Sequence, residues 1–140
     1  MTTAIDTNVI AALWDERREV YLPARKALDH ADEQGGLVMC GSVYAELVAA
    51  PERSVAMLDA FLNETGITVE WETGESVWRG AAVAFRGYVA RRRKSHSSLP
   101  RRILTDFVIG AHAEANRHAL LTLDQRLYKS AFPNLRVIGV

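Results

Sequence analysis

The sequence predicts an α/β protein in which a parallel sheet is covered by helices on both faces. Short apolar runs rich in strand-forming residues alternate with longer runs whose apolar residues recur at helical spacing. This alternation favours parallel strands joined by helical connections. The chain has 140 residues, of which 49% are hydrophobic, and it contains no repeat or linker-like tract. We therefore expect one domain that spans residues 1–140.

The elements of the first half follow from apolar spacing and from residues that begin or end helices. Gly35–Gly36 ends the second helical run, Ser42 is a favoured N-cap, and Pro51 suits a first helical turn. The expected elements are a strand at 4–5, a helix around 9–13, a helix at 20–34, a strand at 37–40, a helix capped by Ser42, a helix at 51–65 and a strand at 67–71.

The second half continues the alternation. Thr73 with Ser76 opens a long helix that ends in the basic run 91–94, and a looser serine-rich segment follows. Thr105 is expected to cap the next helix. The remaining expected elements are that helix, which runs to about 115, a strand at 119–123, a short helix at 127–131 and a last strand at 135–138.

Charge balance and cysteine content narrow the possible classes of protein. Lysine plus arginine and aspartate plus glutamate each number 17, so no net charge points to nucleic acid or to a membrane, although a local basic surface can still bind RNA. Cys40 is the sole cysteine, which excludes an internal disulfide, and we expect it to be a buried reduced thiol. The chain shows no signal-peptide pattern and no apolar run near the roughly 18 residues of a membrane span, so we expect a cytoplasmic protein.

Four acidic residues stand where a strand-like run ends or in the first turns of the helix that follows. In an open parallel α/β sheet these places meet at the carboxyl ends of the strands, where ligands bind. Carboxylates held together stay ionised only if a cation neutralises them, and oxygen-only ligands favour Mg²⁺ or Mn²⁺ over zinc. A metal-bound water is then available as a nucleophile. The four residues of this predicted metal site are Asp6, Glu46, Asp106 and Asp124.

Each acid taken alone has a simpler interpretation. Asp6 could be a helix N-cap, and Glu46 a solvated helix residue. Asp106 could simply favour the dipole of its helix. The coincidence of four such positions, each fixed by flanking apolar runs, favours the metal site over these separate explanations.

Four segments carry a family resemblance: Ile5–Ile10, Tyr44–Leu47, Leu104–Ala111 and Leu121–Asp124. Together they resemble the motifs of the PIN-domain ribonucleases, and among these the VapC toxins of bacterial type II toxin–antitoxin pairs. The resemblance covers essentially the whole chain, and its specificity lies in the order and spacing of the motifs. Two positions depart from a common family form: Thr105 stands where proline often precedes the acid, and Gly110 stands where alanine is common. Neither departure removes a ligand.

This resemblance implies a three-layer α/β/α sandwich with a central parallel sheet of about five strands. It implies a Mg²⁺- or Mn²⁺-dependent endoribonuclease that cleaves structured RNA such as tRNA or ribosomal RNA. It also implies a homodimer and an antitoxin similar to VapB, which would bind a groove near helical runs 20–34 and 51–65. Thr122 would support Asp124, and Asn8 would hold the site together. The implied catalytic residues and metal ligands are Asp6, Glu46, Asp106 and Asp124.

Six basic residues lie just upstream of Asp106. The run Arg91–Lys94 could be a solvated helix end that complements the helix dipole. It could instead belong to a basic rim that holds RNA phosphates beside an acidic centre. Arg101 and Arg102 are the better candidates for RNA binding, because they are nearer the acid.

The remaining candidate residues are expected to have structural roles. We interpret His96 as a loop residue and His112 as a packed histidine on a largely apolar helix, and we assign no role to His30 or His118. The tryptophans are expected in the core or at an interface; they are Trp14, Trp71 and Trp78.

Two alternatives to the nuclease stay open. The start Asp6-Thr7-Asn8 partly resembles the Asp-x-Asp of haloacid-dehalogenase phosphohydrolases, in which Asp6 would be a nucleophile that forms an aspartyl-phosphate. Asn8 in place of the second acid, and the lack of a convincing lysine partner, argue against this alternative. The other alternative is a catalytically idle PIN-like interaction module, against which the costly cluster of acids argues.

Overall fold

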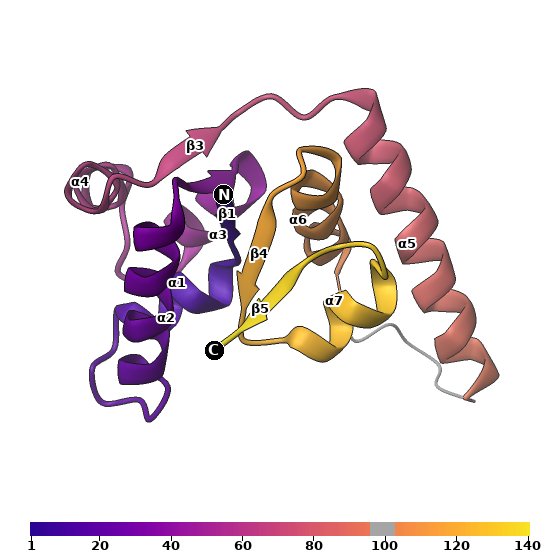
Figure 1. The fold of residues 1–140 in the computed structure, drawn as a ribbon, viewed down its shortest axis with the longest axis horizontal. Helices are drawn as coiled ribbons and strands as arrows, with labels where there is room; N and C mark the ends of the chain where they lie inside the picture. Colours follow the sequence, from indigo (N-terminus) through magenta and orange to yellow (C-terminus); the bar gives the residue numbers. More distant parts are fainter. Residues whose placement is uncertain (96–102) are drawn as a thin grey trace.

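Within the residues that the structure describes, five parallel strands form one sheet in the order β3-β2-β1-β4-β5 (Figure 1). The structure is a computed structural model that describes residues 1–95 and 103–140. The strands are β1 (Thr3–Ile5), β2 (Leu37–Cys40), β3 (Thr68–Glu70), β4 (Ala119–Thr122) and β5 (Val137–Gly139). The predicted parallel sheet of about five strands is therefore confirmed.

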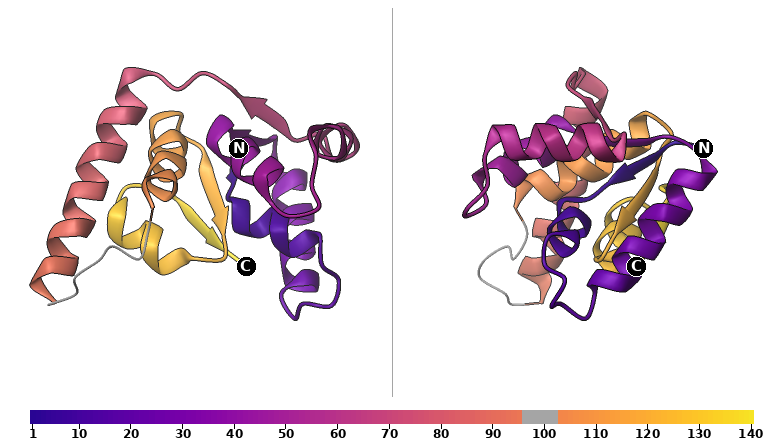
Figure 2. Two further views of the ribbon diagram at one scale, coloured as in Figure 1. Left: turned by 180° about the vertical axis from the view of Figure 1, so that it is seen from behind. Right: turned by 90° about the vertical axis from the view of Figure 1, so that its left-hand side faces the viewer.

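Helices flank the sheet on both of its faces, which gives the three layers of an α/β/α sandwich (Figure 2). Helix α5 is the longest, and it packs along the outer side of α6 (Figure 1). Within the described residues the helices are α1 (Thr7–Leu13), α2 (Tyr21–Gln34), α3 (Gly41–Ala49), α4 (Val55–Thr65), α5 (Glu75–Lys94), α6 (Leu104–Ala115) and α7 (Gln125–Ala131).

The register of the central strands brings several chain turns to one edge of the sheet. Ile5, the last residue of β1, pairs with Leu121 of β4, so that Asp6 directly after β1 lies level with Thr122, the last residue of β4. The Asp6 amide still donates a hydrogen bond to the Leu121 carbonyl, with an N···O distance of 3.0 Å. The carboxyl edge of the sheet therefore holds the start of both α1 and α7.

The core is built on strands that are buried along their whole length. β1, β2 and β4 read as continuous buried runs, as expected for a parallel sheet covered on both faces. Phe85 of α5 stacks on Phe107 of α6, with ring centroids 5.1 Å apart. The Cys40 thiol is free and buried, as predicted, and its burial raises its pKa. It is therefore an inert core side chain at neutral pH.

Three helix starts differ from the sequence prediction. Helix α4 begins at Val55 rather than near Pro51, because the Ser54 hydroxyl accepts the Met57 amide hydrogen at 3.2 Å and so caps it. Helix α3 begins at Gly41, with Cys40 rather than Ser42 at the N-cap, and the Ser42 hydroxyl lies 2.9 Å from the Cys40 sulfur. Helix α6 begins at Leu104, which places Thr105 inside the first turn instead of at the cap.

Two tryptophans lie on the surface and not in the core. The exposed fractions of Trp71 and Trp78 are 62% and 51%. Trp14 is half-buried: its ring meets that of Phe61 edge-on at 5.6 Å, and the Arg53 guanidinium lies over it. Among the described residues, the helices are too short or too polar to cross a membrane.

Candidate active site

Asp6 is the most buried of the four predicted acids. We call the carboxyl edge of the sheet with these acids the acidic edge; they are Asp6, Glu46, Asp106 and Asp124. It occupies the N-cap position of α1 without the side-chain hydrogen bond that normally caps a helix. Instead its Oδ2 accepts a hydrogen bond from the Thr122 hydroxyl at 2.7 Å. With 3% of its surface exposed, Asp6 is poorly solvated, and this burial, with a smaller contribution from the charge of Asp106, raises its pKa from 3.8 to about 6. Asp6 therefore stands at the N-cap position, and its burial and its hydrogen bond to Thr122 go beyond what the simple N-cap interpretation requires.

A small polar network holds Asp6 in place. The Thr122 hydroxyl, which donates to Asp6, also accepts the Asp124 amide hydrogen at 2.9 Å. Asn8 Oδ1 accepts the Leu123 amide hydrogen at 3.1 Å, which ties α1 to the end of β4. Thr122 was expected to support Asp124, and the structure shows that its side chain also orients Asp6. The expected role of Asn8 in holding the site together stays a prediction.

Glu46 reaches the same edge from α3. Its Oε1 accepts a hydrogen bond from the Thr7 hydroxyl at 2.7 Å. Burial raises the pKa of Glu46, the Thr7 hydrogen bond opposes that change, and the negative charge of Asp106 adds to it. Thr7 was not predicted as a site residue, although it lies directly after Asp6 in the first turn of α1.

Asp106 and Asp124 complete the acidic edge. Asp106 lies in the first turn of α6, near enough to Asp6 and Glu46 for its charge to raise the pKa of both. Asp124 is the N-cap of α7, and its Oδ1 accepts the Leu127 amide hydrogen at 3.4 Å. The structure thus brings together the four acids that the sequence predicted.

Tyr128 lies among three of these acids and was missed by the sequence reasoning. It is 1% exposed. Burial and the charges of Asp6, Asp106 and Asp124 raise its pKa, so that its hydroxyl keeps its proton. That hydroxyl lies near enough to Asp6 to lower the pKa of the carboxyl, but among the described residues it does not reach full hydrogen-bond geometry. Its position four residues after Asp124 on α7 is the signal that could have identified it.

The chemistry of the donors fits a hard divalent cation. The four acids of the acidic edge offer carboxylate oxygens, the donors that Mg²⁺ and Mn²⁺ prefer. A cation there would stabilise the ionised form of Asp6, whose pKa burial has raised. Within the described chain, Glu70, His112 and His118 are the group of at least three potential ligands whose ligand atoms all lie within 4.8 Å of one another. The four acids are therefore spaced more widely than the ligands of a closed metal site.

Basic side chains border the acidic edge. Arg91 and Arg92 of α5 and Arg126 of α7 line a pocket of about 320 Å³ together with Asp124. The predicted RNA-binding residues Arg101 and Arg102, and the loop residue His96, lie outside the described residues.

The fold and the site define an α/β/α domain with four acids at the carboxyl edge of a parallel sheet. Comparison with known proteins shows the family to which this domain belongs. The PIN domain matches residues 3–133, so the chain belongs to the PIN domain family. A comparison with curated proteins finds no match.

Several solved structures share the fold. VapBC-1 from nontypeable Haemophilus influenzae matches with a TM-score of 0.68 and 19% identity, over 99% of this chain and 98% of that chain. VapBC2 from Rickettsia felis, bound to a DNA fragment from their promoter, matches with a TM-score of 0.63 and 16% identity over the same shares. A toxin–antitoxin complex from Klebsiella pneumoniae matches with a TM-score of 0.61 and 18% identity, over 98% of this chain and 96% of that chain.

Proposed function

We propose that this PIN domain is a metal-dependent endoribonuclease that cleaves structured RNA, such as tRNA or ribosomal RNA, and acts as the toxin of a VapBC-like pair. The observation that carries the proposal is the convergence of Asp6, Glu46 and Asp106, in which the charge of Asp106 raises the pKa of the other two. Carboxylates that destabilise one another in this way suit a cation-binding site.

Asp6, Glu46, Asp106 and Asp124 would hold one or more Mg²⁺ or Mn²⁺ ions. When bound, such an ion acidifies a water and offsets charge on the scissile phosphate. The residues of the chain then have distinct tasks. The Thr122 hydroxyl orients Asp6, and the Thr7 hydroxyl orients Glu46. Water attacks the phosphodiester in line, leaving a 5′-phosphate and a 3′-hydroxyl.

RNA binding needs positive charge beside this acidic centre. Arg91, Arg92 and Arg126 line a pocket together with Asp124, where their positive charge would attract RNA phosphates to the border of the acidic edge. We propose that Arg101 and Arg102 extend this basic border. Such contacts hold the backbone of the RNA and carry no sequence information.

A small antitoxin and a second copy of the chain are the proposed partners. The likeness to the VapBC structures supports an antitoxin, and helix α4 presents exposed apolar side chains of the kind that protein interfaces cover: Val55 and Met57. If the neighbouring gene encodes a VapB-like protein, its product should form a stable complex with this chain and suppress cleavage. A protein that cuts RNA but binds no such product would be a nuclease outside any toxin–antitoxin pair.

The first test of the activity uses purified, antitoxin-free protein and total cellular RNA. Parallel reactions contain Mg²⁺, Mn²⁺ or excess chelator, and the fragment ends are mapped. We expect discrete metal-dependent cuts that Asp6→Asn abolishes and that the matched control Asp29→Asn, at an exposed position on α2, leaves intact. An active, folded Asp6→Asn protein would contradict the assignment, and a folded, metal-binding wild-type protein that cuts no RNA would favour an idle interaction module.

A further inference from the structure

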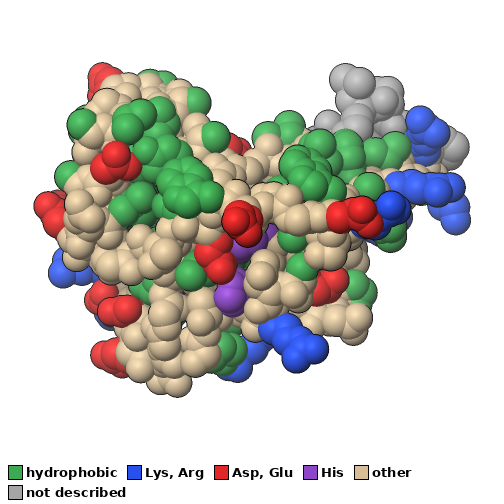
Figure 3. Space-filling model, turned by 90° about the horizontal axis from the view of Figure 1, so that it is seen from above, with side chains coloured by type: hydrophobic (Ala, Val, Ile, Leu, Met, Phe, Trp, Pro, Cys, Tyr) green, Lys and Arg blue, Asp and Glu red, His purple; other side chains and the backbone are tan. Residues whose placement is uncertain are grey.

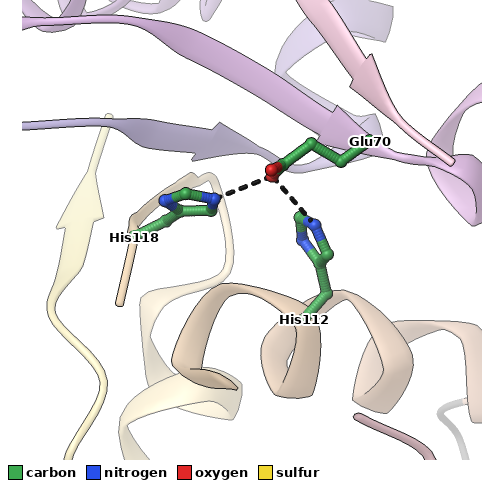
Figure 4. Close-up of side chains that lie close together, drawn as sticks. All are labelled: Glu70, His112 and His118. Carbon is green, nitrogen blue, oxygen red and sulfur yellow. Dashed lines mark hydrogen bonds and ion pairs between the residues drawn. The ribbon is translucent and has the colours of Figure 1, made fainter. Parts of the chain in front are cut away.

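Three potential metal ligands meet at the far end of helix α6 from Asp106. Glu70 is the last residue of β3, His112 lies in the second half of α6, and His118 directly precedes β4 (Figure 4). The Glu70 Oε1 is 2.7 Å from His118 Nε2 and 3.1 Å from His112 Nε2. One ligand atom from each of the three residues lies within 4.8 Å of the other two. This cluster takes no part in the proposed RNA cleavage.

His112 supplies a second, independent observation. It is 1% exposed, yet neither of its ring nitrogens makes a full hydrogen bond with a described residue, although Glu70 Oε1 lies 3.1 Å from its Nε2. A buried polar group left without a hydrogen bond costs about 1–3 kcal/mol. A metal ion bound here would coordinate a ring nitrogen of His112 that makes no full hydrogen bond with a described residue.

We propose that Glu70, His112 and His118 form a second metal site that binds a divalent cation of the imidazole-preferring class, with Zn²⁺ as its type. Two imidazole nitrogens and one carboxylate oxygen are a donor set of hydrolytic zinc sites, whereas the acidic edge offers oxygen alone. The two ends of α6 therefore carry sites of different chemistry.

The observed distances are near those that such a cation requires. Tetrahedral ligands at about 2.1 Å from zinc lie about 3.4 Å from one another. The present separations of 2.7 and 3.1 Å are shorter, so Glu70 has to move outwards by a few tenths of an ångström. Its side chain is 34% exposed at the edge of the sheet and has room for this movement.

The cluster is accessible to solvent and leaves one coordination position open. Glu70 and His112 line a pocket of about 440 Å³, whose wall also includes Trp71 and Glu72. Seen from above, histidine and acidic side chains lie together in the hollowed middle of this face (Figure 3). Three protein ligands leave a fourth position for a water, and the pocket provides the space for it.

Metal binding would also join elements that have few other contacts. β3 is a three-residue edge strand with no fully buried residue, and Glu70 ends it. Coordination would fasten this strand to α6 and to the start of β4. We therefore expect Zn²⁺ to raise the melting temperature of the protein, because the cation binds the folded state in preference to the unfolded chain.

The test is a titration of the full chain with Co²⁺ and Zn²⁺, with visible absorption, calorimetry and thermal unfolding as readouts. Tetrahedral Co²⁺ with nitrogen ligands absorbs strongly in the visible range, whereas Co²⁺ in an octahedral oxygen site absorbs weakly. We expect the strong absorption in the wild-type protein and in Asp6→Asn. Glu70→Gln and His118→Gln should each weaken Zn²⁺ binding by at least about tenfold, since loss of a second-shell partner alone costs that much.

The matched control is His30→Gln, which changes an exposed histidine on α2 and should bind both ions as the wild-type protein does. Circular dichroism in chelator confirms that each variant is folded. Absence of strong Co²⁺ absorption in the wild-type protein would overturn the proposal without reference to any variant. Zn²⁺ binding that Glu70→Gln and His118→Gln leave unchanged, or that Asp6→Asn abolishes, would also overturn it.

Discussion

Asp6 illustrates how a single side chain can oppose folding and still suit the site. Its pKa is about 6 in the folded protein and 3.8 in its ordinary state, so the folded chain binds a proton more tightly than the unfolded chain does. The ionised carboxylate therefore lowers stability above about pH 6, and this loss disappears as the pH falls through 6 towards 4. By linkage the loss is about 3 kcal/mol near pH 8.

We predict from this that Asp6→Asn stabilises the metal-free protein at alkaline pH while it abolishes cleavage. The free energy of unfolding should rise by about 2–3 kcal/mol near pH 8, and the gain should vanish below about pH 4. Urea unfolding in chelator across this pH range measures it, with Asp29→Asn as the control. A gain that does not change with pH would show that the charge of Asp6 is not its cause.

The Thr122 hydroxyl works at the same scale, because it donates to Asp6 and accepts from the Asp124 amide. We predict that Thr122→Val raises the pKa of Asp6 further and shifts the acid limb of the cleavage–pH profile to higher pH. The variant should also lose about 1–3 kcal/mol of stability, because the amide is left without its acceptor. Thr122→Ser keeps the hydroxyl and should resemble the wild-type protein. Equal profiles for the valine and serine variants would contradict this role.

Packing between helices explains one departure from the common form of the family. Gly110 of α6 faces the ring of Phe132, and a Cβ added at residue 110 would lie 2.2 Å from a ring carbon of Phe132. Alanine normally favours a helix over glycine by about 1 kcal/mol. Here the ring of Phe132 is buried, with 3% of its surface exposed, and cannot simply move away. The contact therefore decides in favour of glycine.

We accordingly predict that Gly110→Ala destabilises the protein by about 1–3 kcal/mol, the usual range for overpacking. Adding Phe132→Leu should recover much of this loss, because the smaller side chain frees the space that the methyl group needs. A double-mutant cycle measured by urea unfolding tests the coupling. If the two changes are additive, the ring is not the obstacle.

At the scale of helices and strands, the sequence predicted the features that depend on local patterns of apolar and capping residues. It did not predict the features that depend on contacts between distant parts of the chain or on the hydrogen bonds of one particular cap. The buried strands and the positions of Asp6, Glu46, Asp106 and Asp124 follow from apolar runs and their ends. The start of α4 does not, because Pro51 and Ser54 both suit a helix start, and only the hydrogen bond to the Met57 amide distinguishes them.

The histidine cluster was also beyond local pattern. Glu70 and His118 are 48 residues apart in the chain and meet only because the fold brings the end of β3 close to the start of β4. His112 was correctly predicted to be packed, whereas His118 was given no role. Nothing in the spacing of these residues distinguishes a shared site from three unrelated side chains.

At the scale of the whole molecule, metal binding at the acidic edge should be linked to global stability. A cation that binds only the folded chain at ten times its dissociation constant adds about 1.4 kcal/mol to the free energy of unfolding. We predict that Mg²⁺ stabilises the wild-type protein in this way near pH 8. The effect should weaken as the pH falls through about 6, because the proton then competes for Asp6.

Two variants separate this effect from binding at the histidine cluster. Asp6→Asn should lose most of the Mg²⁺ response, because it removes a charged ligand from the acidic edge. Glu70→Gln should keep that response in full, since Mg²⁺ prefers oxygen ligands and the cluster is built on two imidazoles. Thermal unfolding with Mg²⁺ or chelator measures both. A response that Asp6→Asn preserves would place the Mg²⁺ elsewhere and remove the physical basis for metal-dependent cleavage at the acidic edge.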